Sequence, residues 1–326
     1  MNGGNEKLLE VKDLKTYFFT REGVIQAVDG VNFSVGRGEV VGLVGESGCG
    51  KSVTSLSIMG LVPQPAGKTV SGEILFKNED LLKKSNEEMR RIRGDRISMI
   101  LQDPMVSLNQ LLSVGYQLGE PFKYHNNVIG SLIEMCINLL KKVKVPSPET
   151  RVNDYPFQFS GGMCQRVIIG MGISNNPDLL IADEPTTALD VTIQAQILQL
   201  MKELQREIGA SVILITHDLA TIAQICSRVL VMYAGRIVEK APIKDFYKNP
   251  CHPYSVGLIR SVPVLGRRVR RLYSIEGHPP NLLNPPIGCR FAPRCKQVKK
   301  ICHESYPPEV MLEKNHSISC WLYAKE

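Results

Sequence analysis

Two glycine-containing segments of this 326-residue chain have the composition of phosphate-binding elements. The first runs from Gly45 to Ser52, between an apolar run that predicts a strand and a stretch that predicts a helix. Glycines let backbone N–H groups turn towards an anion, and the N-terminus of the helix adds positive potential. The spacing predicts a triphosphate site in which Lys51 bridges the β- and γ-phosphates and Ser52 binds Mg²⁺. The predicted nucleotide-binding positions are Gly45, Ser47, Gly48, Cys49, Gly50, Lys51, Ser52 and Val53.

The second segment, Ser160-Gly161-Gly162, opens another apolar stretch that predicts a helix. It offers backbone N–H groups at a positive helix end and a hydroxyl beside them. A single domain with a complete phosphate loop does not require a second phosphate-binding element for the same nucleotide. We therefore expect Ser160, Gly161 and Gly162 to serve a nucleotide held by another chain.

Adjacent carboxylates, Asp183 and Glu184, end the apolar run 179–182. We expect Asp183 to hold Mg²⁺ and Glu184 to orient or activate the attacking water. The alternative is that both residues belong to a solvated acidic loop. This interpretation is the weaker one, because the two carboxylates adjoin the end of a strand that is expected to be buried. Asp190 could simply cap the helix that follows it. His217, which follows another apolar run, would in isolation more often be a core residue than a catalytic one.

Hydrophobic periodicity predicts an α/β fold with a parallel sheet and helical crossovers. Residues 193–208 repeat apolar side chains at helical spacing, and Gly209 is a plausible stop. A long stretch from about residue 105 to 158 is mostly helical. The expected strands are 8–11, 27–35, 40–44, 72–76, 179–183, 212–216 and 229–232, and a further helix is expected over 51–61.

The order of these motifs over about residues 8–240 resembles the ATP-binding-cassette (ABC) ATPases. The resemblance implies a P-loop NTPase fold with a RecA-like parallel sheet core, an antiparallel β subdomain and an inserted helical subdomain. It implies that Ser160–Gly162 are the signature motif, with Met163 where glutamine is commonest. It further implies a Q-loop at Gln102 that touches Mg²⁺ or water, a D-loop at Asp190 at a dimer interface and a switch histidine at His217. Phe18 matches the aromatic that stacks on adenine, with Tyr17 as the neighbouring candidate.

The C-terminal part of the chain looks like the extension of oligopeptide and dipeptide importer ATPases. The matching segments are His252-Pro253-Tyr254, 258–263 and 288–295. We expect an ATPase domain over 1–262, with a helical subdomain over about 105–165, and a cysteine-rich extension over 263–326.

The resemblance implies an ATPase that powers peptide uptake from the cytoplasmic face of the membrane. The implied partners are a second ABC ATPase subunit, identical or paralogous, two permease subunits and, indirectly, an extracytoplasmic solute-binding protein. No nucleic acid partner is expected. A nickel importer of the same family is the alternative, as is a soluble, non-transport ABC ATPase. Soluble ABC ATPases usually carry two cassettes or a long coiled coil, which this chain lacks. The extension disfavours an exporter.

Four cysteines of the extension, Cys289, Cys295, Cys302 and Cys320, are separated by five, six and seventeen residues. Structural zinc usually has short Cys-x₂₋₄-Cys knuckles, which this spacing lacks. Four thiolates from an irregular segment suit a 4Fe–4S cluster better, with zinc or simple thiols as alternatives. Either metal would act as a staple for a segment poor in apolar residues. Cys49, Cys136, Cys164, Cys226 and Cys251 lie outside this pattern.

The net charge of +7 is modest, and no apolar run approaches the roughly 18–20 residues that cross a bilayer. The polar first ten residues do not resemble a secretory signal. We therefore expect a cytosolic protein, soluble or peripheral to the membrane. The densest basic run, 267–271, has no interleaved aromatic residues, so we interpret it as a solvated face, with lipid headgroup contact as the minor alternative.

Overall fold

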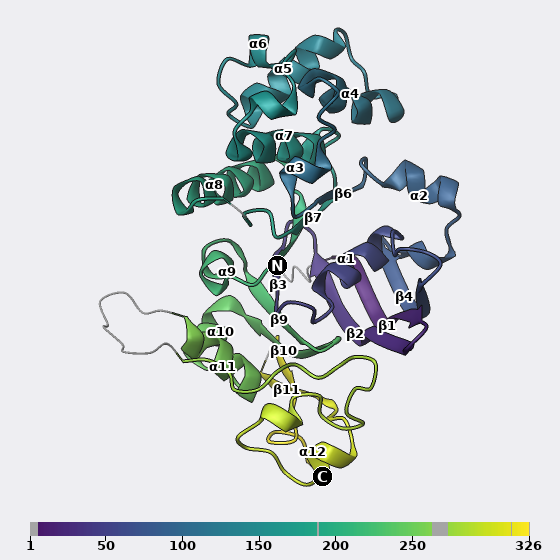
Figure 1. Cartoon of the computed structure of the whole chain (residues 1–326), viewed down its shortest axis with the longest axis vertical. Helices are drawn as coiled ribbons and strands as arrows, with labels where there is room; N and C mark the ends of the chain where they lie inside the picture. Colours follow the sequence, from purple (N-terminus) through teal and green to yellow (C-terminus); the bar gives the residue numbers. More distant parts are fainter. Residues whose placement is uncertain (1–5, 188, 263–272, 314, 326) are drawn as a thin grey trace. The chain divides into compact units, whose positions relative to one another are not determined.

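A computed structural model describes residues 6–187, 189–262, 273–313 and 315–325, and Figure 1 traces them along the chain. The chain splits into two compact units. The first comprises residues up to Leu8, 35–39 and 83–214, and the second comprises 9–34, 40–82 and the residues from Ile215 onward. The domain boundary expected at 262–263 adjoins the undescribed stretch 263–272 and stays a prediction. The basic run 267–271 also lies outside the described residues.

The first unit contains a parallel strand pair and most of the helices (Figure 1). Strands β6 (Ile97–Ile100) and β7 (Leu179–Asp183) pair in parallel, and β8 (Ser211–Thr216), which contains the division between the units, follows β7 in the strand order. The helices are α2 (Asn86–Ile92), α3 (Pro104–Ser107), α4 (Val114–Tyr124), α5 (Leu132–Lys142), α6 (Pro148–Arg151), α7 (Gly161–Ile173) and α8 (Val191–Ile208), with a 3₁₀ turn at Pro156–Gln158.

Helices α4, α5 and α7 pack against one another in this unit. A Cβ atom at Gly170 of α7 would touch Leu118, Leu139 and Val143, each at 3.5 Å. The predicted helix over 193–208 is confirmed as α8, which ends at Gly209 with a left-handed φ of 74°. Glycine adopts this conformation without the steric penalty that other residues meet.

The second unit contains two sheets (Figure 1). One has the order β2-β1-β4-β5, in which β1–β4 and β4–β5 pair antiparallel. The other contains β11-β12-β10-β9-β3, in which β3 and β9 pair in parallel and the remaining pairs are antiparallel. The strands are β1 (Lys7–Thr20), β2 (Gly23–Gly36), β3 (Val40–Val44), β4 (Gly67–Phe76), β5 (Glu79–Asp80), β9 (Arg228–Tyr233), β10 (Arg236–Pro242), β11 (Glu309–Glu313) and β12 (His316–Ser319). The helices are α1 (Lys51–Met59), α9 (Leu219–Ile225), α10 (Ile243–Lys248), α11 (Pro253–Ser261) and α12 (Ile301–Glu304), with 3₁₀ turns at Leu81–Lys83 and Ala292–Arg294.

The C-terminal extension has more regular structure than its sequence indicated. Strand β12 is buried along its length and pairs antiparallel with β10, with Glu239 opposite Ile318 and Lys240 opposite Ser317. Strand β11 then pairs with β12. The second unit therefore includes the end of the chain as two strands of its sheet. The sequence analysis did not predict strands β5, β6, β10, β11 and β12.

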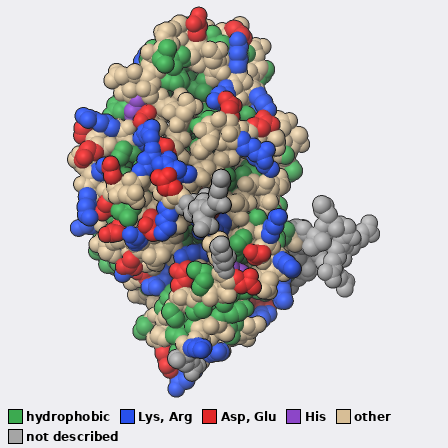
Figure 2. All heavy atoms as spheres, turned by 180° about the vertical axis from the view of Figure 1, so that it is seen from behind, with side chains coloured by type: hydrophobic (Ala, Val, Ile, Leu, Met, Phe, Trp, Pro, Cys, Tyr) green, Lys and Arg blue, Asp and Glu red, His purple; other side chains and the backbone are tan. Residues whose placement is uncertain are grey.

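Lysine and arginine side chains are scattered among aspartate and glutamate on the face that Figure 2 shows. This mixture is typical of a solvated surface. Among the described residues, no helix has the length and apolar character needed to span a membrane.

Candidate functional site

The predicted phosphate loop connects strand β3 to helix α1 in the second unit. Gly48 and Gly50 have φ values of 74° and 106°, which favour glycine. A Cβ atom at Gly50 would lie 2.3 Å from the carbonyl oxygen of Ala27, and one at Gly45 would lie 2.1 Å from that of Met232. The loop therefore packs closely against backbone on one side. No atom lies within 4 Å of the Cβ position at Gly48, so that side of the loop is open.

The polar groups of this loop suit a bound phosphate. Lys51 is 5% exposed, and its Nζ donates to the carbonyl oxygens of Gly45 at 2.8 Å and Glu46 at 3.0 Å. Ser47 and Ser52 are exposed and Val53 is partly buried. Burial raises the pKa of the Cys49 thiol, which keeps it protonated at neutral pH. Its side chain therefore has no evident chemical role.

The two aromatic candidates for adenine stacking differ in their surroundings. The Tyr17 hydroxyl donates to Asp29 Oδ1 at 2.8 Å, and burial together with Asp29 raises the pKa of Tyr17 to about 12. Phe18 is partly buried on the same strand, close to Gly67 of β4. The tyrosine hydroxyl is thus committed within the protein, while the stacking role of Phe18 stays a prediction.

The first unit brings Gln102 and Glu184 together. Gln102 Nε2 donates to Glu184 Oε2 at 3.1 Å, and Thr187 Oγ1 donates to the same oxygen at 2.9 Å. Glu184 has a left-handed φ of 47°, and Asp183 is 5% exposed at the end of β7. A carboxylate in a constrained turn, held by an amide and a hydroxyl, has the fixed orientation that a water-activating group requires.

The signature segment opens α7, as predicted. Ser160 is the N-cap, and its hydroxyl accepts from the Met163 amide at 3.3 Å. Ser160 and Gly161 are exposed, whereas Gly162 faces α8, where its Cβ position lies 2.6 Å from Ile193 Cγ2. Asp190 caps α8 by accepting from the amides of Thr192 and Ile193, each at 3.0 Å. The capping role of Asp190 is thus confirmed, and its D-loop role stays a prediction.

Each unit carries its own part of the predicted machinery. The second unit holds Phe18, the phosphate loop and His217, which is exposed directly after β8. The first unit holds Gln102, Asp183, Glu184, Asp190 and the signature segment. Gln102 and Glu184 are in contact although 82 positions separate them in the sequence.

The four cysteines of the extension are gathered in one region of the second unit. They lie near enough that a thiolate at any one of them would repel a thiolate at each of the other three. Burial first, and then the neighbouring thiols, raise the pKa of Cys289 to about 12, and burial raises that of Cys320 to about 11. Cys289 and Cys302 are also joined by a backbone hydrogen bond of 2.7 Å. Soft thiol donors gathered in this way fit a metal or an iron–sulfur cluster, whose binding would release protons.

Glu239, Cys251 and His316 form a separate buried group, with ligand atoms all within 4.8 Å of one another. The Glu239 carboxylate accepts from the amides of Cys251 at 3.0 Å and His252 at 2.8 Å, and it lies 2.9 Å from His316 Nε2. These bonds tie β10 to α11 and to β12. These hydrogen bonds alone are enough to give Glu239, Cys251 and His316 a structural role, so no metal has to be invoked for this group.

Contacts between the extension and the phosphate loop are the feature that sequence analysis missed. Arg294, from the 3₁₀ turn Ala292–Arg294, forms an ion pair with Glu46 of the loop. The segments that contain Arg294 and Tyr254 carried the family resemblance, but a motif does not reveal which distant residue it touches.

Comparison with known proteins shows the family to which the chain belongs. The family model "ABC transporter" matches residues 28–187, and "Oligopeptide/dipeptide transporter, C-terminal region" matches residues 238–302. The "Dipeptide transport ATP-binding protein DppD" of Bacillus subtilis is 51% identical over 97% of this chain and 95% of its own length. The "Oligopeptide transport ATP-binding protein OppD" of the same organism is 50% identical over 97% of this chain and 89% of its own length.

A solved structure described as "Dimeric structure of a post-hydrolysis state of the ATP-binding cassette MJ0796 bound to ADP and Pi" covers 72% of this chain and 98% of its own. Its TM-score is 0.65 at 28% identity. The similarity to cassettes thus covers the ATPase part of the chain, and the relatives extend it through the C-terminal region. The chain belongs to the ABC transporter ATPases, in the group that carries the oligopeptide/dipeptide transporter C-terminal region.

Proposed function

We propose that this chain binds and hydrolyses ATP to power the import of di- and oligopeptides. The single observation that carries the proposal is the joining of a complete cassette to the peptide-transporter C-terminal region in one chain. Relatives named for dipeptide and oligopeptide transport, with about half their residues identical, support this substrate class over nickel.

The site residues support a division of labour between two ATPase subunits. Gly45 to Val53 would bind the phosphates of one nucleotide, with Ser52, Gln102 and Asp183 available to Mg²⁺. Glu184 would activate the attacking water, and His217 would contact the γ-phosphate. Ser160, Gly161 and Gly162 would complete the site of the opposing subunit, and the exposure of Ser160 and Gly161 supports this.

The remaining partners follow from this role. Two membrane permeases would receive the conformational change that ATP binding and hydrolysis drive in the ATPase subunits. An extracytoplasmic binding protein would deliver the peptide. The chain would lie on the cytoplasmic face of the membrane as a peripheral subunit.

We also propose that Cys289, Cys295, Cys302 and Cys320 hold a 4Fe–4S cluster with a structural role. Four thiolates about 2.3 Å from one zinc ion would lie only about 3.8 Å apart. Among the described residues, no three of these sulfur atoms lie within 4.8 Å of one another, although all four interact. A cubane, with one ligand at each of four corners, suits this wider spacing better than a single zinc ion does.

Reconstitution in lipid vesicles tests the transport role. The chain, its permeases and the second ATPase would be incorporated together, and ATP hydrolysis would be measured with binding protein that carries either a dipeptide or a nickel complex. We expect stimulation by the dipeptide-loaded protein alone. Stimulation by nickel alone would move the assignment to the nickel importer, and failure to associate with permeases would favour a soluble ATPase.

A further inference from the structure

The segment between Cys289 and Cys295 contains two arginines whose side chains leave the extension. The side chain of Arg290 is 4% exposed and that of Arg294 is 5% exposed. A buried guanidinium requires charged or polar partners, because the loss of hydration is otherwise large. The carboxylate partners of these two arginines, Asp29 and Glu46, belong to the nucleotide-binding part of the chain.

Arg294 binds the phosphate loop through a two-pronged contact. Its Nη1 lies 2.8 Å from Glu46 Oε2, and its Nη2 lies 3.1 Å from Glu46 Oε1. Nη1 also donates to the Tyr233 hydroxyl at 3.2 Å, and Nε and Nη2 donate to the carbonyl oxygens of Glu276 and Ile275. The planar guanidinium matches a carboxylate in this geometry, which a flexible lysine would not reproduce.

Glu46 is held at its backbone as well. Its amide donates to the hydroxyl of Tyr254 at 2.8 Å, and Tyr254 is completely buried. The carbonyl oxygen of the same residue accepts from Lys51 Nζ at 3.0 Å. Glu46 is therefore a single residue that joins the extension to the lysine predicted to bind the β- and γ-phosphates.

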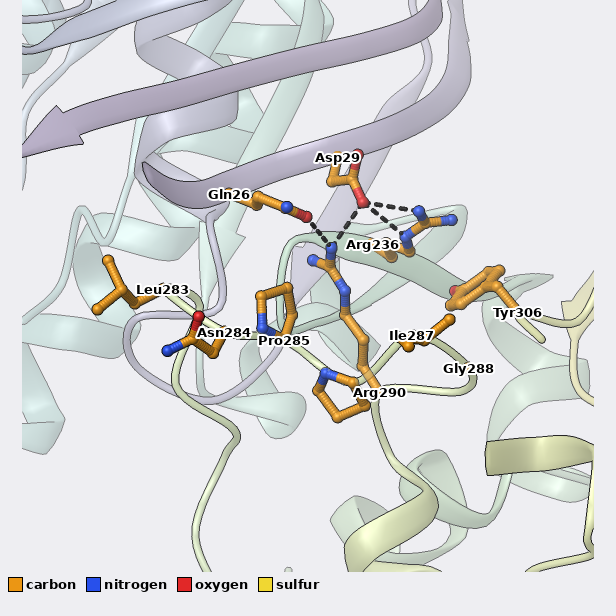
Figure 3. Close-up of a pocket in the computed structure, with 11 residues that line it drawn as sticks. Gln26, Asp29, Arg236, Leu283, Asn284, Pro285, Ile287, Gly288, Arg290 and Tyr306 are labelled. Carbon is orange, nitrogen blue, oxygen red and sulfur yellow. Dashed lines mark hydrogen bonds and ion pairs between the residues drawn. The ribbon is translucent and has the colours of Figure 1, made fainter. Parts of the chain in front are cut away.

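Arg290 makes a second connection, to strand β2. Figure 3 shows its side chain reaching Asp29 and Gln26 beside a cavity of about 380 Å³. Its Nη2 lies 2.6 Å from Asp29 Oδ2, and the other oxygen of Asp29 accepts from Tyr17. Tyr17 precedes Phe18, the predicted adenine contact.

We infer that the cysteine-rich extension sets the conformation of the phosphate loop, and that Arg294 is a positioning residue for ATP acting through Glu46. The inference rests on the assignment of the phosphate loop and is independent of the transported solute. It gives the extension a role in nucleotide binding, in addition to the structural role proposed for a cluster at its four cysteines.

A double-mutant cycle in the full-length chain tests this coupling. Arg294→Gln, Glu46→Gln and the double variant would be compared with the natural chain for binding of a fluorescent ATP analogue and for thermal unfolding. We expect each single variant to raise the dissociation constant about 10-fold, since each removes one partner of an ion pair in which the arginine side chain is buried and the glutamate is partly buried. The double variant should bind no more weakly than either single one, because the same interaction is lost.

Lys240→Gln is the matched control. Lys240 Nζ binds Glu309 at 2.6 and 2.8 Å, which ties β10 to β11 without touching the phosphate loop. This variant should leave the affinity for the analogue within about twofold of the natural value, because it removes an ion pair remote from the loop.

Two results would overturn the inference. One is additive weakening in the double variant, which would mean that Arg294 and Glu46 act separately. The other is unchanged binding by folded Arg294→Gln. If Arg294→Gln does not fold, Arg294→Lys is used instead, because it keeps the charge and loses the two-pronged contact with Glu46. Its dissociation constant for the ATP analogue should also be raised. If the natural chain binds the ATP analogue but powers no peptide transport, the proposed substrate is contradicted and this coupling still stands.

Discussion

Gly162 provides a sharp test of how the signature helix packs. Replacing it by alanine would place a methyl group 2.6 Å from Ile193 Cγ2, closer than the 3.0 Å below which something must shift. The same replacement at Gly161 would meet Leu189 at 3.7 Å, an ordinary contact. Gly161→Ala is therefore the matched control at the adjacent position of the same helix.

The magnitude follows from two opposing effects. Alanine stabilises a helix by roughly 1 kcal/mol relative to glycine, and this gain is shared by both variants. Overpacking costs about 1–3 kcal/mol and applies to Gly162→Ala alone. The difference between the two variants in free energy of unfolding should therefore be about 1–3 kcal/mol, with Gly161→Ala the more stable.

Denaturant unfolding of the two variants, followed by circular dichroism, measures this difference. Ile193→Ala combined with Gly162→Ala should reduce the gap, because the shorter side chain leaves room for the methyl group. Equal stability of the two glycine variants would refute the close packing of α7 against α8. A gap that persists in the double variant would mean that Ile193 is not its cause.

Three further predictions concern catalysis, pH and metal. Glu184→Gln should lower kcat for ATP by about 100-fold or more with ATP binding retained, since general-base catalysis contributes this much, and retained hydrolysis would contradict its role. Burial lowers the pKa of His252 from 6.5 to about 3, so the folded chain resists its protonation and stability should fall as the pH drops below 6.5. At pH 5 the free energy of unfolding should be lower than at pH 7 by about 2 kcal/mol. His252→Asn keeps a side chain that can cap the helix and should reduce this difference, which denaturant titrations at pH 7 and pH 5 measure. Anaerobically purified protein should be brown with four irons per chain, and Cys302→Ala should lose iron while Cys136→Ala keeps it; a colourless protein that carries zinc would contradict the cluster.

The helices and strands that were predicted well from the sequence are those that depend on the pattern of apolar residues within one short segment. The apolar repeat over 193–208 and the stop at Gly209 locate α8 because helix formation depends on neighbouring residues. The run that becomes β7 was predicted with its bounds because a strand buried on both faces is apolar throughout.

Strand β12 was missed for the opposite reason. His316-Ser317-Ile318-Ser319 has one apolar residue in four, and its pairing with β10 is created by the tertiary fold. The site shows the same division. The phosphate loop is a contiguous motif, whereas the Glu46–Arg294 contact joins residues 248 positions apart, which no spacing rule can predict.

This separation in sequence has a consequence for folding during synthesis on the ribosome. Glu46 is translated 248 residues before Arg294, and at about 5–20 residues per second this interval is roughly 10–50 s. During that time the nascent phosphate loop lacks the guanidinium that holds its glutamate, and the edge of β10 lacks the strand that covers it. Chains truncated before the extension would keep the phosphate-loop sequence without its anchor, and their exposed strand edge would make them prone to aggregation.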